Sequence, residues 1–61
     1  MNATTYAVLT PTEGGSPVVY SQNSVDYWEM INSGYKKIHE GTKRECYDYF
    51  EELMIEILSL N

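Results

Sequence analysis

The sequence predicts an α+β domain with the element order ββαβα, in which two helices cover a three-stranded sheet. Two short β-branched and aromatic runs flank a loop of proline and glycine near the N-terminus. A capping-box pattern opens a long amphipathic segment near the C-terminus, and 61 residues leave room for one domain. We therefore expect residues 1–61 to form a single small domain with a loose N-terminus at residues 1–4.

The first two strands are expected at residues 5–10 and 18–21. The first run is β-branched and aromatic and is closed by Pro11, which has no N–H for a ladder. Residues 11–17 include Gly14 and Gly15 and are typical of a turn. The second run, Val-Val-Tyr-Ser, follows directly, so we expect an antiparallel hairpin with an open loop.

A short helix is expected next. Asn23 or Ser24 can cap its first turn, where Asp26 also suits the helix dipole. Gly34 can adopt the left-handed conformation that ends a helix. The apolar stripe of this helix is expected to consist of Val25, Trp28 and Ile31.

The third strand is expected at residues 35–39, ended by Gly41. Tyr35 and Ile38 are three apart and cannot both face one side of a regular strand, so a bulge, or a tyrosine at the sheet edge, would reconcile them. A helix between the second and third strands normally makes them parallel, and the first strand can sit between them, which predicts the sheet order 2-1-3. We expect both helices in one layer, with the other sheet face open.

The long helix is expected at residues 42–60. Thr42 and Glu45 form the capping-box pattern, in which each side chain accepts from the backbone N–H of the other residue. Apolar residues recur at spacings of three and four and should face the core: Cys46, Tyr49, Phe50, Leu53, Ile57 and Leu60. Carboxylates recur similarly on the opposite side: Glu45, Asp48, Glu52 and Glu56.

The amino-acid composition indicates which partners, compartments and cofactors to expect. Nine acidic and four basic residues give a net charge of −5, which on average repels nucleic acid and favours basic partners. No apolar run approaches the ~18 residues of a membrane span, and the N-terminus lacks a signal-peptide pattern, so we expect a cytoplasmic protein without membrane contact. One cysteine and one histidine are too few for a disulfide or a structural zinc site, and no metal or cofactor is expected.

No residue pattern indicates an enzyme. His39 and Cys46 are the one pair that would suit a nucleophile and its base, but Cys46 belongs to the apolar stripe, where a cysteine is usually a small buried hydrophobe. The helix carboxylates lie on a convex face rather than in a cleft that would separate their pKa values. Gly14 and Gly15 lack the lysine of a phosphate-binding loop.

Four segments carry a resemblance to a known family. They are Tyr-Ala-Val at residues 6–8, Val-Tyr at 19–20, Tyr-Lys-Lys-Ile at 35–38 and the start of the last helix at 42–50. In this order they resemble the N-terminal hybrid-binding domain of eukaryotic-type ribonuclease H, shared with the caulimovirus transactivator. The resemblance implies binding of RNA–DNA hybrid or double-stranded RNA through Tyr6, Tyr35, Lys36 and Lys37. The hairpin departs from the family because it carries Glu13 instead of a basic, glycine-rich loop, and Trp28 is displaced from the family's position.

Two functions follow from these patterns. The favoured one is a small acidic interaction protein, an inhibitor or regulator of the kind phages make, which binds a basic or nucleic-acid-binding host protein through Glu45, Asp48, Glu52 and Glu56. The alternative is a nucleic-acid-binding module, whose four basic residues would give weak, salt-sensitive binding.

The C-terminal segment also predicts self-association as a homodimer. It is more apolar around its circumference than a small sheet can cover. The residues expected to make this contact are Met54, Ile55, Leu58 and Leu60.

Overall fold

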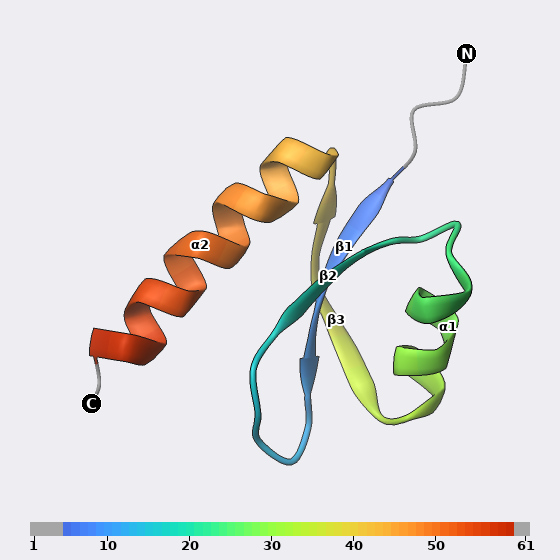
Figure 1. The fold of residues 1–61 in the computed structure, drawn as a ribbon, viewed down its shortest axis with the longest axis horizontal. Coiled ribbons are helices and arrows are strands. Elements are labelled where there is room, and N and C mark those ends of the chain that lie inside the picture. The colour runs from blue at the N-terminus through green and yellow to red at the C-terminus, as the bar shows by residue number, and fades with distance from the viewer. Residues whose placement is uncertain (1–4, 60–61) are drawn as a thin grey trace.

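The chain folds into the five predicted elements in the predicted order (Figure 1). The fold is known from a computed structural model that describes residues 5–59. The elements are β1 (Tyr6–Pro11), β2 (Val18–Ser21), α1 (Val25–Asn32), β3 (Tyr35–Gly41) and α2 (Lys43–Ser59). The expected loose N-terminus at residues 1–4 and the stripe residue Leu60 lie outside the described residues.

β1 is the central strand of the sheet. The order is β2-β1-β3, and both neighbours run antiparallel to β1, which makes β2 and β3 parallel to each other as predicted. Gly14 and Gly15 have φ of 91° and 121° in the connecting loop, values that favour glycine. The α+β class and the sheet order are therefore confirmed.

A bulge in β3 confirms one of the two predicted solutions for that strand. Val8 pairs with His39, whereas the next residue, Leu9, pairs with Lys37, so Ile38 is the extra residue. The shift places Lys37 and Glu40, three residues apart, on the same side of the sheet, where they form an ion pair. β3 is two residues longer than the expected 35–39, and Gly41 ends it as its last residue, paired with Tyr6.

The two helices lie on opposite sides of the sheet, which corrects the expected single layer (Figure 1). On one side, Ala7 and Leu9 of β1 pack with Tyr27 of α1. On the other side lies Val8, whose side chain alternates with theirs. Val8 and Cys46 of α2 are both fully buried, and neither belongs to the cluster around α1.

Of the three residues predicted for the apolar stripe of α1, Ile31 packs against the core, but Val25 and Trp28 do not. Tyr27 is buried and Met30 and Ile31 pack against the same cluster, whereas Val25 and Trp28 are 73% and 56% exposed. The predicted ends are confirmed. The Ser24 hydroxyl accepts from the Tyr27 N–H at 3.1 Å, and Gly34 has φ of 104° after the last turn.

α2 covers the second face of the sheet with its N-terminal half. Cys46 is fully buried, and the Tyr49 ring stacks on His39 of β3 with centroids 4.3 Å apart and planes 4° apart. Ile55 and all later described residues are exposed, and the helix runs on past the strands (Figure 1). Neither described helix is long and apolar enough to cross a membrane.

Candidate protein-binding surface on α2

The acidic face of α2 is a row of four exposed carboxylates, Glu45, Asp48, Glu52 and Glu56. Spacings of three and four residues place them along one side of the helix over about 16 Å of its length. Because Cys46 is fully buried and the Tyr49 ring stacks on His39 of β3, α2 is held in a rotation that leaves this row exposed.

Glu45 also caps the N-terminus of α2. Its carboxylate accepts from the Thr42 N–H at 2.9 Å, and its own N–H donates to the Thr42 hydroxyl at 3.1 Å, so the predicted capping box is confirmed. Hydrogen bonding of the Glu45 carboxylate to the Thr42 backbone, and secondly to the Thr42 side chain, holds the pKa of Glu45 below its ordinary value. The carboxylate therefore stays ionised as the acidic face requires.

The other three carboxylates make no ion pair with the described residues. Between residues 5 and 59 the one ion pair joins Lys37 and Glu40, and Gln22 donates to the same Glu40 carboxylate at 3.1 Å. These contacts, with Lys37 first, lower the pKa of Glu40. Asp48, Glu52 and Glu56 are exposed and make no ion pair with a described residue, so their side chains are open to a partner.

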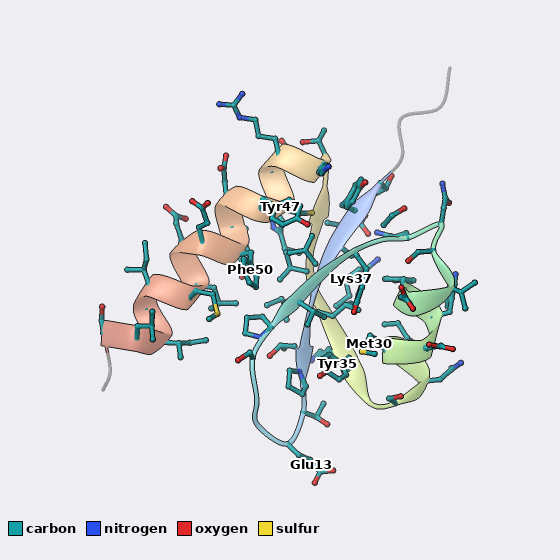
Figure 2. The ribbon with its side chains drawn as sticks, viewed as in Figure 1. Glu13, Met30, Tyr35, Lys37, Tyr47 and Phe50 are labelled. Carbon is teal, nitrogen blue, oxygen red and sulfur yellow. The ribbon has the colours of Figure 1, made fainter. Side chains whose placement is uncertain are left out.

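The residues of the predicted nucleic-acid site are not brought together. Tyr6 and Lys36 belong to the α2 side of the sheet by their pairing, but at opposite ends of β1. Lys37 and Tyr35 belong to the α1 side, beside the strands in Figure 2. A strand sends neighbouring side chains to opposite faces, so Lys36 and Lys37 cannot share one surface.

His39 and Cys46 lie in packed positions. The His39 ring stacks on Tyr49, and burial raises the pKa of the Cys46 thiol, which keeps it protonated and unreactive. Among the described residues, no three side chains of His, Cys, Asp or Glu come close enough together to hold a metal ion.

Two exposed apolar areas complete the surface. Val25 and Trp28 form one on α1, which the sequence analysis missed because it assigned both to the core. On α2, the predicted self-association residues Ile55 and Leu58 are exposed, Met54 is half-buried, and Leu60 lies outside the described residues.

Comparison of the chain with models of protein families, with characterised proteins and with solved structures finds no match.

Proposed function

We propose that this chain is a non-enzymatic interaction protein that inhibits or regulates another protein by binding its basic surface. The observation that carries this proposal is the acidic face, whose members Asp48, Glu52 and Glu56 are exposed and unneutralised by the described chain. The carboxylates stand in a row on a helix that is fixed to the sheet, so their charge pattern is preorganised. Binding a partner therefore costs little conformational entropy on this side of the interface.

The charge pattern also defines the partner. A row of carboxylates about 16 Å long attracts a surface of lysine and arginine, as found on proteins that bind nucleic acid. Attraction of this kind raises the association rate and weakens as salt shortens the Debye length, which is about 8 Å at physiological ionic strength.

The test is affinity capture from the cells of origin, with and without nuclease, using three forms of the chain as bait. The variant Asp48→Lys with Glu52→Lys reverses the acidic face and leaves the capping residue Glu45 intact. The matched control, Glu13→Lys with Glu29→Lys, makes the same charge change on exposed residues in the hairpin loop and on α1.

We expect the wild type and the control to retain a nuclease-resistant protein partner that the α2 variant loses. Circular dichroism should show an unchanged fold, because exposed helix positions usually alter stability by less than about 0.5 kcal/mol. Binding that nuclease abolishes, that the α2 variant strengthens, and that Lys36→Ala with Lys37→Ala weakens would contradict the proposal in favour of nucleic acid.

A further inference from the structure

The flank of α2 opposite the acidic face carries an apolar strip that the sheet covers only in part. The strip consists of Tyr47, Phe50, Met54 and Leu58, at spacings of three, four and four residues. Tyr47 is 43% and Leu58 66% exposed, while Phe50 and Met54 are half-buried. The rings of Tyr47 and Phe50 meet edge to face with centroids 6.5 Å apart (Figure 2).

We propose that this strip joins two copies of the chain, with α2 packed antiparallel against α2 of a second copy. In this arrangement Tyr47 of each copy lies opposite Leu58 of the other, and Phe50 lies opposite Met54. The strip is therefore its own complement about a two-fold axis, as a closed homodimer requires. Side chains three and four residues apart form the ridges that interlock when helices pack.

The charges of α2 favour a second copy in the antiparallel direction. Lys43 and Arg44 occupy the first turn, where the helix dipole disfavours cations, and the last turn contains no basic residue. Antiparallel pairing brings both cations beside the C-terminal end of the other helix, whose dipole attracts them. Parallel pairing would instead place the cations of both copies together.

The contact between copies leaves the acidic face uncovered, because the two lie on opposite flanks of α2. The inference therefore stands independently of the proposed function. Glu51 is the acidic residue beside the strip, and the two-fold axis brings it near its counterpart in the second copy. The variant Glu51→Gln should strengthen the dimer, since it removes this repulsion.

Sedimentation equilibrium from micromolar to millimolar protein tests the contact. Leu58→Ser should weaken dimerisation by about tenfold or more, because each dimer loses two buried leucines. Ile55→Ser is the matched control, since Ile55 is 63% exposed on the same helix but outside the strip, and it should change the dissociation constant by less than about twofold. A wild-type chain that stays monomeric, or a larger loss from Ile55→Ser, would overturn the proposal.

Disulfide cross-linking tests whether the two α2 helices pack antiparallel. Tyr47→Cys mixed with Leu58→Cys should give a cross-linked heterodimer under mild oxidation, whereas neither variant alone should cross-link. The native Cys46 is fully buried and will not compete. Cross-linking of each variant with itself would show parallel pairing, and no cross-linking of the mixture would place the contact elsewhere; either result overturns the proposal.

Discussion

The carboxylate of Glu45 lies so close over Gly41 that a Cβ on this glycine would stand 2.5 Å from the Glu45 Oε1 atom. The same oxygen accepts the Thr42 N–H that opens α2. The last residue of β3 must therefore be small for the next element to be capped, although the backbone of Gly41 does not have a positive φ.

Gly41→Ala should lower the free energy of unfolding by about 0.5 to 2 kcal/mol, the usual cost of losing an N-terminal cap. The physical cause is displacement of the Glu45 carboxylate, so the cost should nearly vanish when Glu45→Ala is already present. Urea unfolding followed by circular dichroism measures this double-mutant cycle. If the losses of unfolding free energy in the two single variants added up in the double variant, Gly41 and Glu45 would contribute to stability independently.

The capping box predicts part of the acid sensitivity of the fold. Because the pKa of Glu45 is lowered in the folded chain, its ionised form stabilises the fold above the unfolded pKa, and this stabilisation is lost as the pH falls through the folded pKa. Glu45→Gln keeps a capping side chain but cannot titrate.

Between about pH 7 and about pH 3, Glu45→Gln should therefore lose less stability than the wild type. Chemical unfolding across this range is the measurement. Glu52→Gln, an exposed change on the same helix without a capping role, is the control and should follow the wild type. If all three proteins lost the same unfolding free energy, the Glu45 cap would not contribute to the acid sensitivity of the fold.

The burial of two leucines predicts which of them is more costly to truncate to alanine. Leu9 is fully buried and Leu53 only half-buried, so Leu9→Ala should cost about 2 to 5 kcal/mol and Leu53→Ala clearly less. A chain of this length is typically stable by roughly 3 to 9 kcal/mol, so Leu9→Ala should remove a large share of that stability and lower the melting temperature more than Leu53→Ala does. Thermal melts decide the order, and a greater loss from Leu53→Ala would contradict the assigned core.

The thiol of Cys46 should report unfolding. It is fully buried, and burial raises its pKa, so alkylation requires the chain to open. Alkylation of the native protein should be slower than that of a chain unfolded in urea by about tenfold for each 1.4 kcal/mol of opening free energy. Labelling as fast as that of the unfolded chain would show that α2 leaves the sheet freely.

The order of elements and both helix starts could be predicted from the sequence because they depend on local chemistry, as in the reciprocal bonds of Thr42 and Glu45. The buried face of α1 could not be predicted reliably. In only eight residues, the spacing of Val25, Trp28 and Ile31 is as regular as that of Tyr27, Met30 and Ile31.

A signal for helices on both sides of the sheet was present in the sequence. Ala7, Val8 and Leu9 form a continuous apolar run, which is typical of a strand buried on both faces. The acidic face was predicted correctly as an exposed row because helical periodicity alone sets it. The spacing of Tyr35 and Ile38 already indicated a bulge as one solution, but the predicted lysine and tyrosine cluster ignored strand alternation, which sends Lys36 and Lys37 to opposite faces.

The bulge at Ile38 also bears on how the protein avoids aggregation by sheet extension. β3 forms one outer edge of the sheet, and its two lysines and its irregular residue make that edge a poor template for another chain. The other edge, β2, is four residues long, and its Ser21 carbonyl already accepts from the Ser24 N–H. Because neither edge strand readily pairs with another chain, copies of this protein should associate through their helices. At high protein concentration we therefore expect discrete complexes in preference to cross-β fibres.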